Sequence, residues 1–286
     1  MSELLSESEA VNEPVVEYYE RNTPFFLRVG EGGSVGHIHR AVWADGVFTR
    51  TQALDYVYAR LLERIECLES AQPRVLDLGC GVGAGVRYLA KSLPLCPKAL
   101  TISPSQAATA RRLNAEQGLD GSGIICADFS SSPLPQSDLM YGVESLVHAH
   151  DLEMVARNVS RSLSVGGELA LCDDFLARPY GELKDGEKGI IDCLREGWRI
   201  PSLNTLEAFS DIFNKHGLEL IVSEDWTPFL KLERLRDRML SVMMSLGGDL
   251  PIQSTLWGSW KAGNALRYSL QEGLTHYRFG IWKKVR

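Results

Sequence analysis

A carboxylate followed by glycines at every second position is the most informative chemical feature of this sequence. Residues 74–83 read RVLDLGCGVG, so an apolar run ends in Asp77 and continues through Gly79, Gly81 and Gly83. Glycine has no Cβ atom, so it permits positive φ angles and a close approach of the backbone to a ligand. The pattern predicts a buried strand entering a tight turn, with the polar end of a ligand beside the carboxylate. Its spacing differs from the GxGxxG of dinucleotide-binding sites.

Three further segments follow predicted strands and carry side chains that could bind a ligand or move a proton. They read TISPSQ, ADF and YGVESLVHAHD in chain order. An ionised Asp128 in the second segment can only accept hydrogen bonds, which suits recognition of an exocyclic amine. In the third segment, Glu144 and His148 could act as acid, base or counter-charge, whereas Asp151 is predicted to cap the helix that follows.

Alternating strands and helices must position these residues. RVLDLG, ALTIS, GIICADF, DLMYGV and GELALCDDF predict five strands, and the segments between them have apolar residues at helical spacing. A helix at 203–216 and strands at 217–226 and 274–285 follow. Such units predict a parallel sheet whose ligand lies beyond the carboxyl ends of the strands. The expected fold class is α/β, a Rossmann-like seven-stranded mostly parallel sheet with helices on both faces, an N-terminal helical cap and an inserted lid.

The predicted elements divide the chain into three parts. Residues 1–72 form an N-terminal helical arm and cap, and residues 73–176 form the ligand-binding Rossmann-like core. Residues 177–286 add lid insertions together with the last core helix and strands. The lid segments 177–201 and 227–273 are rich in arginine and aromatic residues, and both should leave the sheet on its ligand side.

Composition excludes several classes of function. The 286 residues are 44% hydrophobic and carry a formal net charge of −7, with no basic cluster that would grip nucleic acid. No apolar run approaches the roughly 20 residues of a membrane span. The acidic N-terminus is not a secretory signal or transit peptide, so we expect a cytoplasmic protein. The six scattered cysteines, including Cys126 and Cys172 in predicted strands, indicate free buried thiols and no metal site.

The stretch VLDLGCGVG resembles the first motif of class I S-adenosylmethionine (SAM) methyltransferases. The resemblance implies that SAM is the cofactor and that Gly79, Cys80 and Gly81 hold its amino-acid half. Asp77 would lie near the ammonium group of SAM. The alternative explanations of this motif are a nucleotide site of another doubly wound enzyme and a plain strand–turn–helix.

The TISPSQ segment lacks the acidic residue that many class I methyltransferases use for the ribose. It resembles the T-x-S-x-x-Q of a subset that includes cyclopropane fatty acid synthases and sterol, tocopherol and isoprenoid C-methyltransferases. The resemblance implies that Ser103 and Gln106 bind the ribose side, while Thr101 and Ile102 line the pocket. Gln106 could instead be an ordinary residue of the first helical turn.

The ADF and ESLVH segments extend the resemblance to the adenine and to the reacting methyl group. In the family, the strand end Ala127, Asp128 and Phe129 holds adenine, with the carboxylate accepting from the amino group. ESLVH resembles the E-S-x-x-H of the same subset, which lies where the methyl group points. Glu144 would therefore contact the cofactor and act as base or stabilise positive charge, and His148 is the second catalytic candidate.

The N-terminal sequence LRVGEGGSVGHIH resembles a segment of isoprenoid C-methyltransferases related to geranyl diphosphate C-methyltransferase. The resemblance implies that this region folds over the active site, with Tyr18 and Tyr19 upstream and His39 as a further candidate base. Packing of a helix and loop on the sheet is the alternative. Aromatic rings suit an apolar acceptor and could shield a carbocation. The lid holds Trp198, Arg199, Trp257 and Trp260.

We therefore expect a SAM-dependent methyltransferase of secondary metabolism. It would methylate an alkene carbon of a small apolar acceptor, a terpenoid or prenylated natural product, as in teleocidin-type prenyl C-methyltransferases, and the resulting cation could cyclise. The alternatives are O- or N-methylation with His148 or His39 as base, and SAM binding without turnover. The acidic N-terminal segment outside the sheet suggests a homo-oligomer with exchanged arms.

Overall fold

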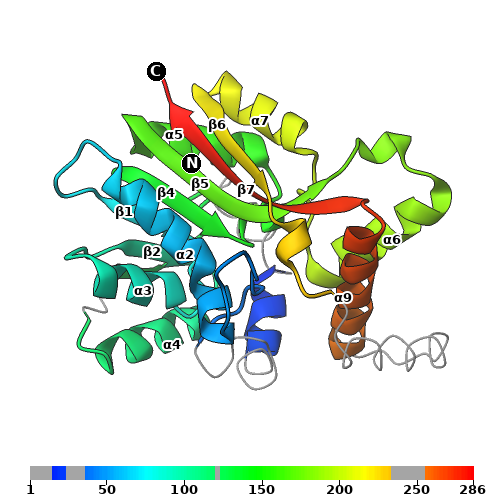
Figure 1. Cartoon of the computed structure of the whole chain (residues 1–286), viewed down its shortest axis with the longest axis horizontal. Coiled ribbons are helices and arrows are strands. Elements are labelled where there is room, and N and C mark those ends of the chain that lie inside the picture. Colours follow the sequence, from blue (N-terminus) through cyan, green and yellow to red (C-terminus); the bar gives the residue numbers. More distant parts are fainter. Residues whose placement is uncertain (1–14, 24–35, 120–122, 233–254) are drawn as a thin grey trace, which may run out of the picture.

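The structure is a computed structural model that describes residues 15–23, 36–119, 123–232 and 255–286, the last range with side chains from residue 258 onward. A single seven-stranded sheet with the order β3-β2-β1-β4-β5-β7-β6 runs through it (Figure 1). The predicted fold class is confirmed. The strands are β1 (Val75–Leu78), β2 (Lys98–Thr101), β3 (Ile124–Cys126), β4 (Ser137–Val143), β5 (Leu163–Leu176), β6 (Leu218–Asp225) and β7 (Thr275–Lys284).

The strand order places the glycine turn at the switch point of the sheet. β1 pairs in parallel with β2 on one side and with β4 on the other, so successive connections leave in opposite directions. A crevice at the carboxyl ends of the strands results at this point. β7 lies between β5 and β6 and runs antiparallel to both, a position that the sequence pattern did not predict.

Helices cover both faces of the sheet. They are α2 (Arg50–Glu66), α3 (Ala84–Ser92), α4 (Pro104–Ala115), α5 (Leu152–Ser162), α6 (Asp185–Trp198), α7 (Leu206–Lys215) and α9 (Thr255–Gln271), and residues 15–23 are also helical. Two core clusters lie on the two faces. One contains Leu61 of α2 and Tyr141 of β4, and the other contains Val155 of α5 and Phe213 of α7.

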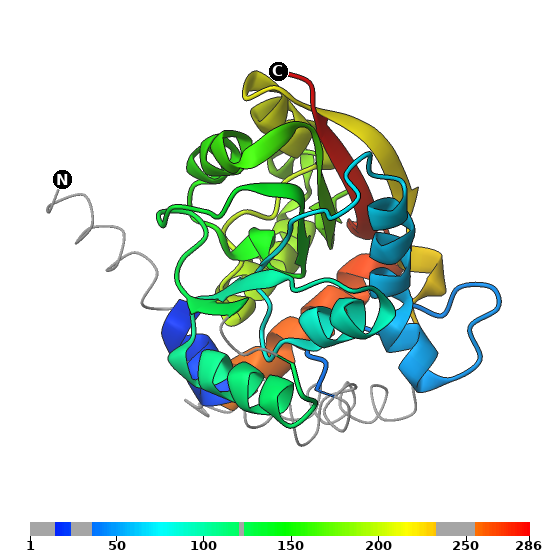
Figure 2. The same ribbon diagram turned by 90° about the vertical axis from the view of Figure 1, so that its left-hand side faces the viewer.

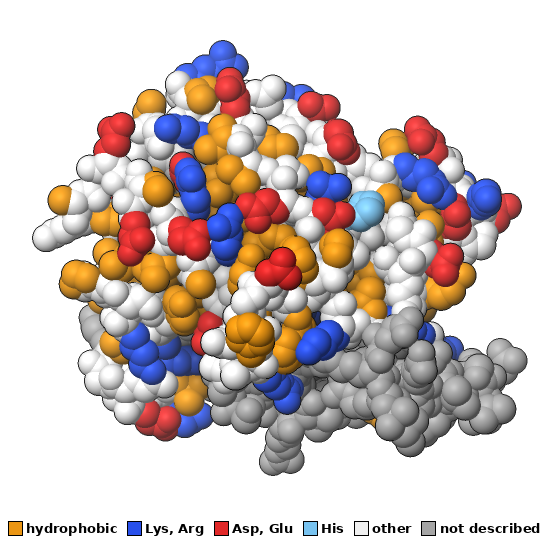
Figure 3. Space-filling view, viewed as in Figure 1, with side chains coloured by type: hydrophobic (Ala, Val, Ile, Leu, Met, Phe, Trp, Pro, Cys, Tyr) orange, Lys and Arg blue, Asp and Glu red, His pale blue; other side chains and the backbone are white. Residues whose placement is uncertain are grey.

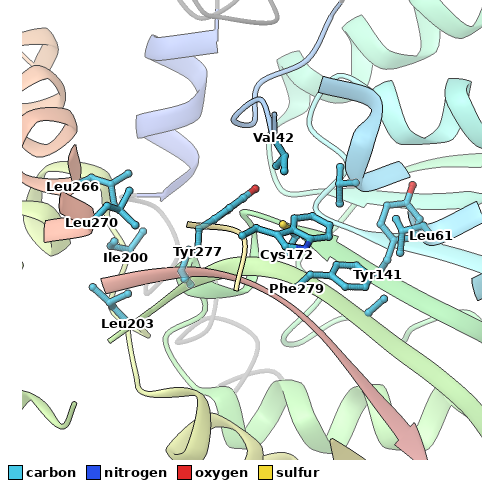
Figure 4. Packing of buried hydrophobic residues seen from close by; sticks show 14 of the residues in the cluster. Val42, Leu61, Tyr141, Cys172, Ile200, Leu203, Leu266, Leu270, Tyr277 and Phe279 are labelled. Atoms are coloured by element: carbon cyan, nitrogen blue, oxygen red, sulfur yellow. The ribbon is translucent and has the colours of Figure 1, made fainter. Parts of the chain in front are cut away.

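The first of these clusters continues without a break from the core into the lid. Figure 4 shows Leu61 and Tyr141 on the core side, and Tyr277, Leu266 and Leu270 toward the lid. Since all are buried in one cluster, the lid helix α9 is anchored to the sheet by the same apolar contacts that hold the core together.

The lid is a pair of closely packed helices, α6 and α9, beyond the carboxyl ends of the strands (Figure 1). A Cβ atom on Gly197 would lie 2.6 Å from the Cβ atom of Ala262 and 2.8 Å from the carbonyl oxygen of Gly258. Glycine is therefore required where the two helices cross, and α6 is held at a fixed position above the sheet.

The N-terminal helix 15–23 closes the same end of the molecule from the other side. Figure 2 shows it next to α4, with α9 passing close by. The Gln106 amide donates to the Thr23 hydroxyl, and Tyr18 hydrogen-bonds Ser259 of α9. The helix thus bridges the core and the lid.

Sequence signals at the helix starts agree with the structure. Ser103 caps α4 with Pro104 as its first residue, and the Asp151 side chain accepts from the backbone of Met154 to cap α5, as predicted. Cys172 is buried, but Cys126 is exposed because β3 is the edge strand, so the prediction of a buried thiol was wrong there.

Basic and acidic side chains are interspersed over the face in Figure 3. Within the described ranges, no helix combines the length and the apolar character needed to cross a membrane.

Candidate active site

A cavity opens at the carboxyl ends of the central strands, beneath helix 15–23 and the end of α6. Most of the residues singled out in the sequence line it, whereas Ser103 and Ala127 do not. The lining residues among those candidates are Tyr19, His39, Asp77, Gly79, Cys80, Gly81, Thr101, Ile102, Gln106, Asp128, Phe129, Glu144 and His148.

The glycine turn is shaped by positive φ angles and a close backbone approach. Gly79, Gly81 and Gly83 have φ angles of 108°, 53° and 82°. A Cβ atom on Gly79 would lie 2.5 Å from the Cβ atom of Ser145, so no larger residue fits without displacing the segment after β4. The glycines therefore keep two parts of the cavity wall, after β1 and after β4, in contact.

Asp77 is a buried carboxyl group at the end of β1, with 3% of its surface exposed. Burial raises its pKa to about 7, because the charged form loses hydration. A cationic ligand group beside Asp77 would stabilise the ionised carboxylate and so lower its pKa again. The ammonium of an amino acid is such a group, so this end of the cavity fits the amino-acid part of SAM.

Neutral hydrogen bonds dominate the wall after β2. The Gln106 side-chain oxygen accepts from the Thr101 hydroxyl at 2.8 Å, and its nitrogen donates to the Thr23 hydroxyl at 3.1 Å. Ser103 does not face the cavity, because its hydroxyl accepts from the backbone of Gln106 as the cap of α4. Its proposed contact to the ribose therefore has no direct geometric support.

A carboxylate from the N-terminal helix lies at the end of β2, where the TISPSQ segment has none. Glu20 accepts from the Ser103 hydroxyl at 2.5 Å and from the backbone of Ser105 at 3.0 Å. These bonds dock helix 15–23 on the first turn of α4. Nothing in the sequence around Glu20 indicates this role, because it lies 83 positions from Ser103.

Asp128 lies at the cavity wall after β3. Its carboxylate accepts from the backbone of Ser130 at 2.7 Å and from the Ser131 hydroxyl at 3.3 Å. These bonds fix the turn and orient the carboxylate, while the adjacent Phe129 supplies a ring to the lining. An acceptor beside an aromatic ring suits a purine with an amino group.

Glu144 holds an unusual backbone conformation at the cavity. Its φ angle is 51°, in the left-handed region that residues with a side chain adopt only when their surroundings enforce it. One oxygen, Oε1, accepts from Arg40 N at 2.9 Å, from Arg40 Nε at 3.0 Å and from Tyr277 OH at 2.9 Å. Among the described residues, none donates to Oε2.

These donors keep Glu144 ionised. Burial alone would raise the pKa of Glu144, but the positive charge and hydrogen bonds of Arg40 outweigh it and lower the pKa below its ordinary value. The site therefore holds a negative charge beside the cavity at neutral pH.

Arg40 links Glu144 to a second carboxylate. Its two terminal nitrogens donate to the two oxygens of Asp174 at 2.9 and 2.7 Å, and its guanidinium lies 4.0 Å from the ring centre of Tyr277. Burial raises the pKa of the adjacent Asp173 well above its usual range. None of Arg40, Tyr277, Asp173 and Asp174 was predicted from the sequence as a site residue. The consecutive carboxylates in the apolar strand GELALCDDF were the one available signal.

His148 is held as a neutral base by a carbonyl and a phenol. Nδ1 lies 2.9 Å from the Arg199 carbonyl oxygen, which can only accept, so Nδ1 carries the proton. Nε2 lies 2.8 Å from the Tyr19 hydroxyl, which therefore donates. Burial lowers the pKa of His148. Arg199 has a φ angle of 54°, so Glu144 and Arg199 are the two described non-glycine residues with left-handed backbones.

His39 lines the cavity, but both of its ring nitrogens are engaged. Nδ1 donates to the Arg40 carbonyl at 2.9 Å, and Nε2 lies 3.1 Å from His37 Nδ1. Burial and the neighbouring His37 lower the pKa of His39 to about 4. His39 therefore also orients the backbone of Arg40 beside the cavity.

The cavity is acidic and aromatic, and its lining contains no lysine or arginine among the residues that the structure describes. Trp198 and Ile200 at the end of α6 and Tyr18 of helix 15–23 add apolar surface. Trp260 is 37% exposed. The Trp257 side chain and residues 27–35 lie outside the described residues.

Comparison with known proteins agrees with this site. Residues 76–171 match the family model of the methyltransferase domain. The methyltransferase GfsG of Streptomyces halstedii is 27% identical over 77% of this chain and 79% of its own length. The 24-methylenesterol C-methyltransferase 3 of Arabidopsis thaliana is 26% identical over 62% of this chain and 54% of its length. The chain thus spans only about half the length of some of the relatives that it matches.

A solved geranyl diphosphate methyltransferase in complex with GPP and sinefungin has the same fold. Its TM-score is 0.71 at 16% identity, covering 96% of this chain and 100% of that one. The fold and the glycine turn define a class I methyltransferase. Residues 76–171 are a methyltransferase domain, so the enzyme is a SAM-dependent methyltransferase and S-adenosylmethionine is its cofactor.

Proposed function

We propose that this enzyme methylates an alkene carbon of a terpenoid or prenylated natural product. The observation that carries the proposal is Glu144, an ionised carboxylate held in a left-handed backbone conformation at the cavity. One of its oxygens is fixed by Arg40 and Tyr277, and the other is not bonded by a described residue. A fixed negative charge in a site removed from water stabilises a cation that forms beside it.

The site residues divide by the part of the reaction that they would serve. We name Asp77, Gly79, Gly81, Gln106 and Asp128 the donor half, and Glu144, Arg40, Asp174, Tyr277 and His148 the acceptor half. Bound SAM would supply an electrophilic methyl group on a sulfonium. The donor half would orient it, and the acceptor half would receive the alkene and stabilise the cation left by its attack.

The absence of lysine and arginine from the described lining favours an acceptor without a diphosphate group. A diphosphate requires arginine, lysine or a metal ion, whereas the described lining contains five acidic residues and no lysine or arginine. The five are Asp77, Asp128, Glu144, Asp173 and Asp174. We therefore propose a neutral or cationic prenylated acceptor, with cyclisation of the cation as a further outcome.

O- or N-methylation of a small natural product is the second candidate function. His148 supports it, because its Nε2 lone pair is available at the cavity through the Tyr19 hydroxyl. A base of this kind is needed when a hydroxyl or amine must lose its proton. The ionised Glu144, which would stabilise a carbocation formed beside it, favours C-methylation.

The substitution Glu144→Gln tests the proposal. It keeps the size of the side chain but removes its charge, so C-methylation of a prenylated indole should fall about 100-fold or more. Deuterated SAM with mass spectrometry and NMR would locate the transferred methyl group. Glu153→Gln on the surface of α5 is the matched control. Unchanged C-methylation in Glu144→Gln, or a methyl group on oxygen or nitrogen, would contradict the proposal.

We also propose a division into residues 1–72, 73–176 and 177–286 and a homo-oligomer with exchanged N-terminal arms. Helix 15–23 contacts its own α4 through Glu20 and Thr23. In the part of the chain that the structure describes, no strand connects this helix to the sheet, so the same contacts could form between neighbouring copies. A monomer in light scattering would exclude exchange.

A further inference from the structure

We propose that Tyr19 and His148 form a proton relay that removes the proton from the product cation, while Glu144 only stabilises that cation. This inference rests on the proposed C-methylation. It assigns a base other than Glu144 to the proton that must leave when the cation becomes a neutral product. The relay consists of the Tyr19 hydroxyl, the His148 ring and the Arg199 carbonyl.

The direction of the relay follows from the hydrogen-bonding capacity of its members. The Arg199 carbonyl accepts from Nδ1 of His148 and fixes the tautomer with the lone pair on Nε2. That lone pair faces the Tyr19 hydroxyl at 2.8 Å. The two rings meet edge to face, with centroids 5.4 Å apart. Both side chains line the cavity, so the Tyr19 oxygen can face a ligand while its proton points to His148.

The backbone of Arg199 supports this arrangement. Its left-handed φ angle of 54° ends α6 and directs its carbonyl at His148 rather than along the helix. Such a conformation costs free energy in a residue with a side chain. The lid thus orients the base, because Arg199 ends α6 above the cavity and its carbonyl also fixes the His148 imidazole.

Glu144 is poorly placed to take the proton. Three hydrogen bonds to Oε1 and the charge of Arg40 stabilise its ionised form. Protonation of Glu144 would remove the negative charge that pairs with the Arg40 Nε atom. A neutral imidazole carries no such constraint, since its nearest described hydrogen-bond partners are the phenol and the carbonyl.

The step balances without an added reagent. A C–H bond next to the cationic carbon breaks, its electron pair forms a C=C bond, and the proton adds to the Tyr19 oxygen. The original phenolic proton passes at the same time to Nε2 of His148. Tyrosine ends neutral and the imidazole ends as imidazolium, which then releases its proton to solvent. Where the cation first closes a ring, the ring-closed cation loses its proton in the same way.

The test separates deprotonation from methyl transfer by measuring product and S-adenosylhomocysteine together. His148→Gln keeps an acceptor for the Tyr19 hydroxyl but is not basic, and Tyr19→Phe removes the relay oxygen. We expect the deprotonated product per S-adenosylhomocysteine to fall about tenfold or more in both variants. Water-trapped alcohol or isomeric alkenes should replace it. His216→Gln, which alters a surface histidine paired with Glu153, is the control.

An unchanged product ratio in both variants would overturn the relay. Failure of the proposed function is recognised separately, on the wild-type enzyme, by an O- or N-methylated product. A second measurement needs no turnover: ¹⁵N NMR of labelled histidine in the protein without cofactor. We expect a protonated Nδ1 and a bare Nε2 for His148, with an Nε2 shift that changes in Tyr19→Phe. A proton on Nε2 would contradict the proposal.

Discussion

The donor and acceptor halves of the site are built in different ways. Asp77, Gly79 and Gly81 lie within five consecutive positions, and their geometry follows from one strand and one turn. Glu144 instead depends on Arg40, 104 positions earlier, and on Tyr277, 133 positions later. The turn of the donor half can therefore form from local structure, although Gln106 also donates to Thr23 of helix 15–23. The acceptor half requires the arm, the sheet and the last strand together. Substitutions should separate the two halves.

The largest effect is expected in the glycine turn. In Gly79→Ala, the new Cβ atom would lie 2.5 Å from that of Ser145, at a φ angle of 108°. We expect SAM affinity to fall about 100-fold or more. Gly166→Ala is the control, because Gly166 also has a positive φ angle but nothing lies within 4 Å of its added Cβ. Isothermal titration calorimetry measures the SAM affinity of both variants. Equal SAM affinities in Gly79→Ala and Gly166→Ala would contradict the role of the turn.

Arg40→Lys should damage the acceptor half and spare the donor half. Lysine keeps the charge but cannot make the paired hydrogen bonds to Asp174 while also binding Glu144. Turnover should fall about 10- to 100-fold, with little change in SAM affinity. Arg64→Lys alters a comparable paired contact to Glu168 outside the cavity and should leave turnover unchanged. A parallel loss of SAM affinity in Arg40→Lys would show that the halves are not independent.

The donor half should respond to pH through Asp77. Its pKa of about 7 in the free protein means that the carboxyl group is protonated below neutral pH and cannot pair with an ammonium. SAM affinity should therefore be nearly full at about pH 8, be about half of that at pH 7, and fall about tenfold between pH 8 and pH 6. Adenosine, which has no ammonium, should bind without this dependence. A SAM affinity that stays constant between pH 8 and pH 6 would exclude Asp77 as the partner of the ammonium. The same conclusion would follow if the SAM affinity of Asp77→Asn had the same pH dependence as that of the wild-type enzyme.

Tyr277→Phe should give the smallest effect. It removes one of the three hydrogen bonds to Glu144 but leaves the ring beside Arg40. We expect turnover to fall about three- to tenfold and SAM affinity to stay constant. Tyr180→Phe is the control, since that hydroxyl binds Asp192 on the lid. Steady-state kinetics would show whether the acceptor half tolerates loss of a single donor.

The sequence predicted the sheet, the glycine turn and the segments that line the cavity. Hydrophobic periodicity located all seven strands, because each strand buries its own apolar residues. It did not place β7 between β5 and β6, since strand order depends on long-range packing. Ser103 shows the limit for side chains: its motif was clear, but its hydroxyl caps α4 and binds Glu20 rather than facing the cavity.

The sequence by itself determined the buried strand, Asp77 and the glycine turn that resemble the SAM-binding motif, because a strand, a carboxylate and glycines act through neighbouring positions. Only the tertiary structure decided the charge of Glu144 and the tautomer of His148. It brought Arg40 and Tyr277 to Glu144 and the Arg199 carbonyl to His148. Charge and tautomer depend on partners distant in the chain, and no local pattern encodes such contacts.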